Sequence, residues 1–354
     1  MDPKKIAMGL KKGRIELQKG EVEYYRFKDG FAGIERGTVV CGSRIIRGFP
    51  HIRRIFSLGK GVKRNMGDCV LYAEEKIDGF NVRIAYISGK IWAFSRGGFL
   101  DLFVTEKARG LGLEGFFRET PGYVICAEMI GNTPYTEPAE GFDVKLYVFD
   151  VDVGGGTYLP CAAKYELLKK HSIGSAPLLG RFESSDIAGL KKAMLELDKS
   201  RKEGMVLKSE DRKKAVKFVT PYSDIEDIAG ETRLFYDMPI GFYYQRVLRS
   251  AFFIREFGLD REEYARKLGR AFYEGLIAAI RDAEEGLPAA EEFEILIKDL
   301  GIWDDLRRHM SREVKVEELW RRAEDGKTRI RFRKIYKKTT KTLTAFAGGK
   351  GVMD

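Results

Sequence analysis

The feature that most constrains the fold is a series of short apolar segments between Val70 and Val219. The segments are VLYAEEKI, NVRIAYI, KIWAFS, YVICAEMI, KLYVFDVDV and GMVLKS, with helical patterns between them at about residues 101–109, 161–170 and 186–198. Segments of this length that are rich in β-branched and aromatic residues predict strands. The glycines at 154–156 predict a hairpin turn. We therefore predict an α+β domain over residues 65–237.

The patterns on either side of this domain are different. Residues 21–48 contain short apolar runs separated by turns, which predicts a small β-rich N-terminal domain over residues 1–64. Apolar side chains at helical spacing predict a helical module over residues 238–300, followed by a C-terminal domain with a basic tail over residues 301–354. The helical stripe consists of Tyr264, Leu268, Phe272, Leu276, Ile280, Phe293, Leu296, Ile297 and Leu300.

The net charge of +10 is concentrated near the two ends of the chain. Residues 1–64 hold sixteen Lys and Arg against six Asp and Glu, and residues 326–341 hold eight basic residues and no acidic one. Such clusters favour a polyanionic partner such as nucleic acid, although a solvated, charge-rich surface gives the same pattern. Alternation in the second cluster predicts a strand with one basic face, made of Arg329, Ile330, Arg331, Phe332 and Arg333.

Other residue types exclude several classes of function. Hydrophobic residues make up 44% of the chain but form no run long enough to cross a membrane. The N-terminus is too charged for a secretory signal, so we expect a cytoplasmic protein with no membrane partner. The four cysteines form no CxxC pair and the three histidines are far apart, which argues against a zinc site or disulfide framework. Lysine and carboxylate chemistry is therefore favoured over a Ser/His or Cys/His hydrolase.

Two common nucleotide-binding patterns do not explain this chain. Gly110, Gly112 and Gly115 match GxGxxG, but they follow a helical segment and no βαβ unit surrounds them. We interpret them as a loop that ends a helix. The sequence also lacks GxxxxGK[ST], so any use of ATP would not involve a P-loop.

An ordered series of reactive residues at strand ends is more informative. It begins with the pattern KxDGxN, formed by Lys76, Asp78, Gly79 and Asn81 after the segment VLYAEE. KxDG alone is a weak signal, but further motifs follow it in order, each at the edge of a predicted strand. They are Ser95-Arg96-Gly97-Gly98, Glu128 in CAEMIG, Phe149 in YVFDV, Glu203-Gly204 before MVLK, and Lys214 and Lys217 in KKAVKFV.

This order resembles motifs I, Ia, III, IIIa, IV and V of the covalent nucleotidyltransferases, which include DNA ligases, RNA ligases and capping enzymes. The resemblance covers residues 70–220 by motif, and the order of domains is similar to that of archaeal ATP-dependent RNA ligases. Asn81 stands where DNA ligases and capping enzymes usually carry arginine, which favours RNA. The resemblance implies an ATP-grasp-like nucleotidyltransferase core with antiparallel sheets, and an enzyme that joins or circularises RNA with 5′-phosphate and 3′-hydroxyl ends.

The resemblance also implies residue roles. Lys76 would attack ATP to form lysyl-AMP, and AMP would then pass to the RNA end as AppRNA. A lysine amine has a pKa of about 10.4 in water, so Lys76 would need neighbouring cations and a divalent metal to become a nucleophile. Glu203 and Glu128 would hold that metal, Mg²⁺ or Mn²⁺. The residues implied in binding ATP are Glu75, Lys76, Ile77, Asn81, Arg96, Glu128, Phe149, Val206, Lys214 and Lys217.

Two of these roles stay open at the level of sequence. Phe149 would stack on adenine with Val206 or Met205 on the other face, or it would simply pack within a buried strand. Of the two basic residues in the last motif, Lys217 fits better and Lys214 is a second candidate.

The chain departs from DNA ligases and capping enzymes after Lys217, where helices replace the OB-fold that carries motif VI. Other residues must then orient pyrophosphate, and the candidates, which fit RNA-backbone contacts equally well, are Arg44, Arg47, Arg53 and Arg54. The helical stripe and the resemblance together predict a homodimer through residues 238–300. The alternatives to an RNA ligase are a DNA ligase, a capping-type nucleotidyltransferase, and a non-catalytic RNA-binding protein.

Overall fold

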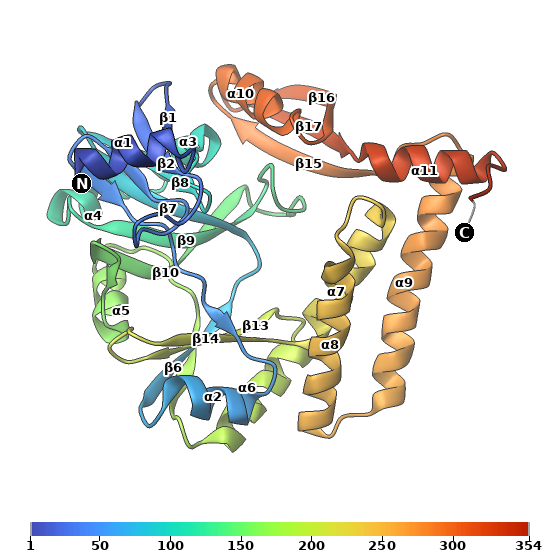
Figure 1. Cartoon of the computed structure of the whole chain (residues 1–354), viewed down its shortest axis with the longest axis horizontal. Coiled ribbons are helices and arrows are strands. Elements are labelled where there is room, and N and C mark those ends of the chain that lie inside the picture. Colours follow the sequence, from blue (N-terminus) through green and yellow to red (C-terminus); the bar gives the residue numbers. More distant parts are fainter. Residues whose placement is uncertain (1, 353–354) are drawn as a thin grey trace.

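Two five-stranded sheets form the centre of the computed structural model, which describes residues 2–352 (Figure 1). The first sheet has the order β11-β10-β9-β7-β8 and the second β12-β6-β13-β14-β5. The strands of the first are β7 (Phe80–Ile87), β8 (Lys90–Ser95), β9 (Val124–Gly131), β10 (Val144–Gly154) and β11 (Thr157–Tyr158). Those of the second are β5 (Arg53–Arg54), β6 (Val70–Lys76), β12 (Leu178–Glu183), β13 (Gly204–Ser209) and β14 (Ala215–Val219).

Each central sheet has its own hydrophobic core. Side chains of β7, β9 and β10 pack with the first set of helices, and side chains of β6, β13 and β14 pack with the second. The other face of each central sheet carries none of these helices, and a pocket lies between the two sheets on that side. The first set is α3 (Leu102–Arg109), α4 (Glu114–Glu119) and α5 (Cys161–Lys170), and the second is α2 (Leu58–Met66) and α6 (Ile187–Lys199).

The N-terminal residues form a small sheet, as the sequence predicts. Tyr24, Val39 and Ile46 pack against Trp92 and Phe94 of the first central sheet. The last part of the predicted N-terminal range behaves differently, because β5 and α2 belong to the second central sheet. The N-terminal elements are α1 (Pro3–Lys11), β1 (Ile15–Gln18), β2 (Tyr24–Phe27), β3 (Val39–Cys41) and β4 (Arg44–Ile46).

A helical arm leaves the second central sheet (Figure 1). Its long helices turn Tyr243, Tyr264 and Ala271 towards one another and pack on Ile225 and Ile228. None of the helices in residues 2–352 is both long and apolar enough to cross a membrane. The arm consists of α7 (Pro221–Glu231), the 3₁₀ turn Thr232–Leu234, α8 (Ile240–Phe257) and α9 (Arg261–Glu284).

The prediction that Phe293, Leu296, Ile297 and Leu300 continue the helical stripe is wrong. Residues Ala290–Ile297 form strand β15, which pairs with β17. The residues around Phe293 satisfy a period of two as well as a helical period, since Phe293, Ile295 and Ile297 are buried. The first strand of the C-terminal sheet therefore lies inside the range predicted as a helical module.

The C-terminal sheet, of order β15-β17-β16, docks on the first central sheet through a shared core. Ile330 and Phe332 of β17 are fully buried, which confirms the predicted alternation. On the opposite face each arginine is ion-paired: Arg329 with Glu324 and Glu294, Arg331 with Glu292, and Arg333 with Glu317. The predicted basic face is therefore largely neutralised. The remaining elements are α10 (Leu300–Met310), β16 (Lys315–Glu324), β17 (Lys327–Ile335) and α11 (Lys337–Ala347).

Candidate active site

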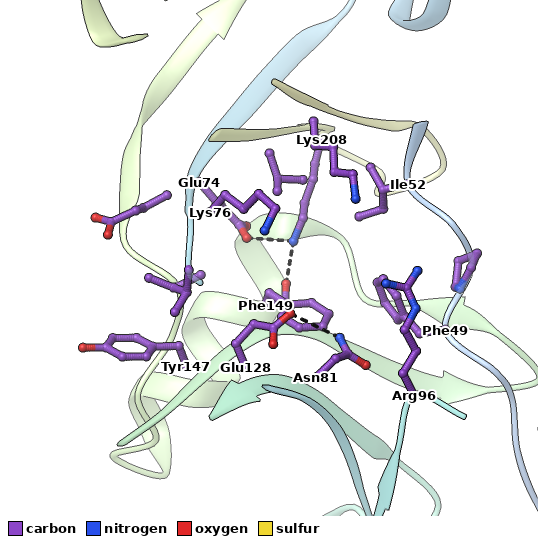
Figure 2. A pocket seen from close by; sticks show the side chains of 16 residues that line it. Phe49, Ile52, Glu74, Lys76, Asn81, Arg96, Glu128, Tyr147, Phe149 and Lys208 are labelled. Atoms are coloured by element: carbon purple, nitrogen blue, oxygen red, sulfur yellow. Dashed lines mark hydrogen bonds and ion pairs between the residues drawn. The ribbon is translucent and has the colours of Figure 1, made fainter. Parts of the chain in front are cut away.

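A pocket lies between the two central sheets and collects most of the residues that the motifs single out (Figure 2). Strands β6, β13 and β14 form one wall, and β7, β9 and β10 form the other. Side chains alternate along a strand, so residues two apart on these strands face the pocket together. The predicted ATP-binding residues that line it are Glu75, Lys76, Ile77, Asn81, Arg96, Glu128, Phe149, Val206 and Lys217.

Lys76 is the last residue of β6 and extends into the pocket. The register of β6 and β13 places Gly204 opposite Lys76, and the amine of Lys76 forms an ion pair with the carboxylate of the preceding residue, Glu203. The two side chains are 19% and 12% exposed, so the pair is shielded but reachable. Strand pairing therefore brings Lys76 and Glu203 together although they are far apart in the sequence.

Glu128 and Asn81 face each other across the β7–β9 pair, with Asn81 Nδ2 3.4 Å from Glu128 Oε1. Glu128 Oε2 and Asn81 Oδ1 are buried and have no hydrogen-bond partner among residues 2–352. Burial raises the pKa of Glu128 to about 8, against the lowering effect of Lys76. Burial likewise raises the pKa of Glu203 to about 7. Nearby positive charge therefore does not offset the burial of these two carboxylates.

The opposite end of the pocket is strongly basic. Arg96, from the end of β8, lies 3.2 Å from His51 through Nη2 and Nδ1. The charge of Arg96 is the main reason that the pKa of His51 is lowered, followed by burial and by Lys217. Burial and the nearby Arg54, Lys76 and Arg96 lower the pKa of Lys217 to about 8. Arg96 and Lys217 thus face this cavity, and neither forms an ion pair with a carboxylate of residues 2–352.

An apolar wall completes the pocket. Phe149 and Phe49 pack edge to face with their ring centroids 5.0 Å apart, and Ile52 and Val206 line the same cavity. Phe149 is partly exposed to the pocket rather than buried in a core. An aromatic ring and a branched aliphatic side chain at one cavity suit a flat heteroaromatic base.

The sequence analysis missed a buried charge network beneath this wall. The Lys208 amine donates to Glu74 at 2.7 Å and to the Phe149 carbonyl oxygen at 2.6 Å (Figure 2). The Lys164 amine donates to Glu74 at 2.6 Å and to the same carbonyl at 3.1 Å. Asp150 joins Lys208 at 3.1 Å and Arg212 at 2.6 Å. Glu74 and Lys208 lie two residues from Lys76 and Val206, so strand alternation could have identified them.

Three predicted residues are placed differently from the rest. Lys214 is not brought to the pocket, because it follows the turn before β14 and its amine donates to the Met66 carbonyl oxygen at 2.8 Å. Glu75 borders the pocket, but its carboxylate points away and pairs with Lys202 at 3.0 Å. Ile77 borders it just after β6 ends. Of the two lysines that the last motif offered, only Lys217 lines the pocket.

The carboxyl end of the pocket could hold a divalent cation. No group of three or more His, Cys, Asp and Glu side chains suitable for a metal occurs within residues 2–352. The pair Glu128 and Glu203, together with the unpartnered Asn81 Oδ1, still fits Mg²⁺ or Mn²⁺, which usually keep water and substrate phosphate among their ligands.

Comparisons with known proteins show which families the chain resembles. Residues 70–220 match the family described as RNA ligase, and residues 231–350 match the family described as ligase Pab1020 C-terminal region. An uncharacterized protein from Methanocaldococcus jannaschii is 29% identical over 351 residues, which are 93% of this chain and 88% of that protein.

Solved structures resemble the whole chain. One described as a putative ATP-dependent DNA ligase from Aquifex aeolicus is 31% identical, with a TM-score of 0.93 over 99% of this chain and 100% of its own. Two forms of an archaeal ATP-dependent RNA ligase are 27% identical, with TM-scores of 0.89 and 0.90. They cover 99% of this chain and 97% and 96% of their own.

The antiparallel sheets, the central lysine and the ordered motifs define an ATP-dependent nucleotidyltransferase of the ligase type. Because the catalytic and C-terminal regions both match, the chain belongs to the archaeal-type ATP-dependent RNA ligase family.

Proposed function

We propose that this enzyme joins 5′-phosphate and 3′-hydroxyl RNA ends, within or between molecules, through lysyl-AMP and AppRNA intermediates. The observation that supports this most directly is the position of the Lys76 amine, inside a pocket with carboxylates at one end and cations at the other. ATP would place its base on the Phe149 wall and its phosphates towards Arg96 and Lys217.

The proposed reaction has three steps. The Lys76 amine attacks the α-phosphorus of ATP, and the bond to pyrophosphate breaks. An oxygen of the RNA 5′-phosphate then attacks the AMP phosphorus and displaces Lys76, which yields AppRNA. Finally the 3′-hydroxyl attacks the 5′-phosphorus and AMP leaves. Arg96 and Lys217 stabilise the charge that develops on phosphate oxygens.

A divalent cation held by Glu128 and Glu203 would neutralise phosphate charge. If Glu203 were a ligand of such a cation, it would no longer hold the amine of Lys76. The amine would then be available as the nucleophile.

The experiment that tests this function uses ATP or GTP labelled at the α-phosphate, followed by a denaturing gel. We expect label from ATP and not GTP on the wild-type chain, and none on Lys76→Ala, which should still bind RNA. Sealing of 5′-phosphorylated RNA is then compared with that of DNA of the same sequence. Labelling by GTP alone would contradict the assignment as an ATP-dependent ligase. Labelling of Lys76→Ala would contradict the role of Lys76 as the nucleophile.

We also propose a homodimer formed through the helical arm. On α9 the exposed apolar residues Tyr273, Ile277 and Ile280 follow helical spacing, with exposures of 70%, 61% and 46%. On α8, Ile240 is 88% exposed and Tyr244 is 68% exposed. A surface of this kind on a protruding arm suits a second copy of the same arm.

A further inference from the structure

The short strand β5 brings an arginine from the N-terminal part of the chain to the active site. β5 pairs in parallel with β14, and the register sets Arg54 opposite Lys217. Side chains of residues directly opposite in a sheet point to the same face. Lys217 lines the pocket, so Arg54 lies beside its basic end and is one of the charges that lower the pKa of Lys217.

Arg54 differs from the other arginines of this segment. The Arg44 guanidinium donates to the Gly122 carbonyl oxygen at 3.1 Å, and Arg47 forms an ion pair with Glu35 at 2.9 Å. Arg53 points outward and donates to Asn65 at 2.9 Å. The Nε atoms of Arg44, Arg47 and Arg54 are all buried without a hydrogen-bond partner, but within residues 2–352 the rest of the Arg54 guanidinium has no partner either.

No acidic side chain within residues 2–352 forms an ion pair with Arg54. The nearby carboxylate of Asp224, which senses the charge of Arg54, is already bound by Arg249 at 2.9 Å. A partly buried guanidinium without an anion is costly unless a ligand supplies one. Arg54, Arg96 and Lys217 together place three cationic side chains at this end of the pocket, which is more positive charge than a single α-phosphate requires.

We propose that Arg54 binds the β- and γ-phosphates of ATP and orients the pyrophosphate leaving group. This inference rests on the proposed function, in which Lys76 attacks the α-phosphorus. As the bond between that phosphorus and the bridging oxygen breaks, its electron pair leaves with pyrophosphate. The Arg54 guanidinium donates hydrogen bonds to the developing charge and transfers no proton.

The same guanidinium could instead hold the 5′-phosphate of RNA, and the separate steps of the reaction distinguish the two anions. Lysine adenylylation from ATP, and its reversal by added pyrophosphate, both require the pyrophosphate site. Sealing of chemically prepared AppRNA bypasses it, and AMP transfer from the adenylylated enzyme to 5′-phosphorylated RNA requires only the RNA phosphate site.

The test compares Arg54→Gln and Arg54→Lys with the matched control Arg53→Gln, after thermal unfolding shows that each variant is folded. For Arg54→Gln we expect a loss of about 10²-fold in adenylylation and in its reversal by pyrophosphate, with AppRNA sealing within about twofold of wild type. Arg54→Lys should recover part of the loss, and Arg53→Gln should behave as wild type.

Two results would count against the inference in different ways. If Arg54→Gln adenylylates normally and is slow only in AMP transfer to 5′-phosphorylated RNA, Arg54 is an RNA contact and the inference is wrong. If the wild-type chain is not labelled by ATP at all, the proposed function fails and the inference fails with it.

Discussion

Lys76 and Glu203 belong to motifs far apart in the sequence, yet their side chains form an ion pair across two paired strands. An amine that is held in an ion pair with a carboxylate is not available to attack phosphorus. If Lys76 is the nucleophile, as proposed, this ion pair would be its resting state. In the proposed mechanism, Glu203 would have to release Lys76 before adenylylation, and a divalent cation would be an alternative partner for its carboxylate.

Replacing Glu203 with Gln should therefore slow lysine adenylylation rather than accelerate it. The variant frees the amine but removes the negative charge that would hold a metal, so we expect a loss of about 10²-fold or more in single-turnover labelling. The loss should be smaller at high Mn²⁺ or Mg²⁺. Glu210→Gln is the control, because Glu210 is exposed and pairs only with the exposed Arg181. Faster labelling of Glu203→Gln would contradict the metal role.

The buried network beneath Phe149 should be important for stability. Lys208→Met leaves Glu74 with Lys164 alone and Asp150 with Arg212 alone, and it removes a donor from the Phe149 carbonyl. Breaking a buried ion pair from one side typically costs about 3–5 kcal/mol, which urea unfolding measures.

Lys213→Met is the matched control for that change, since the Lys213 side chain is 82% exposed. It should unfold within about 0.5 kcal/mol of wild type. If Lys208→Met and Lys213→Met unfold alike, the network contributes little. Adding Glu74→Gln to Lys208→Met should cost less than the sum of the single changes, because the two residues interact directly.

Glu231 in the helical arm should make stability depend on pH. Burial, with Glu291 and Asp227 nearby, raises its pKa to about 7 from an ordinary value of 4.5. The folded chain then holds a proton that the unfolded chain releases, so its stabilising effect is complete below pH 4.5 and is lost as pH rises to about 7. We expect Glu231→Gln to stabilise the chain at pH 8 by about 1–2 kcal/mol, allowing for solvent screening, and much less at pH 5.

Unfolding of wild type and Glu231→Gln at both pH values measures this difference. The control is Glu226→Gln, on the exposed side of the same helix. An equal gain for Glu231→Gln at pH 5 and pH 8 would show that the carboxyl does not titrate in this range.

The proposed dimer predicts that Ile277→Asp yields a monomer. Ile277 is 61% exposed at the middle of the apolar face of α9, and a buried, unpaired carboxylate there would oppose association. Sedimentation at micromolar concentration should give a dimer for wild type and a monomer for Ile277→Asp. Glu274→Gln, on the same helix, should remain dimeric. A wild-type monomer would refute the proposal.

The sequence predicts which motif residues gather at the pocket better than it predicts the residues around them. Motif order singles out Lys76, Glu128, Glu203 and Lys217, and strand pairing does bring them together. Lys76 and Glu203 stand at strand ends as predicted, whereas Glu128 and Lys217 lie within β9 and β14. Motif order does not exclude Lys214. Lys214 and Lys217 are both lysines near one turn, and only the structure shows that the Lys214 side chain points away from the pocket to the Met66 carbonyl oxygen. Arg54 depends on a two-residue strand, which is too short to leave any periodic signal.

The C-terminal region shows a second limit of prediction from sequence. Phe293, Leu296 and Ile297 fit a helical period and Phe293, Ile295 and Ile297 fit a strand period, and the three-strand register decides between them. Counting charge along residues 326–341 also misses the glutamates that neighbouring strands place beside Arg329, Arg331 and Arg333. A cluster of charge along the chain is therefore a poor measure of charge at the surface.

These ion pairs change which basic residues should contact RNA. Lys337, Lys338 and Lys341 on α11 are exposed, and none forms an ion pair within the part of the chain that the structure describes. Replacing all three with Gln should weaken RNA binding at low salt. The slope of log affinity against log salt should become shallower by about 0.7 for each phosphate of a single strand that the variant no longer neutralises.

Arg331→Gln serves as the comparison for these lysines, because Arg331 already pairs with Glu292 at 2.7 Å. It should change affinity and salt slope little, since an RNA phosphate would have to displace that glutamate before it could bind the guanidinium. Filter binding of 5′-phosphorylated RNA at several salt concentrations measures both effects. The opposite result would be a shallower salt slope for Arg331→Gln and no change for the triple lysine variant. RNA would then bind along the arginine face of the C-terminal sheet and break its ion pairs on binding.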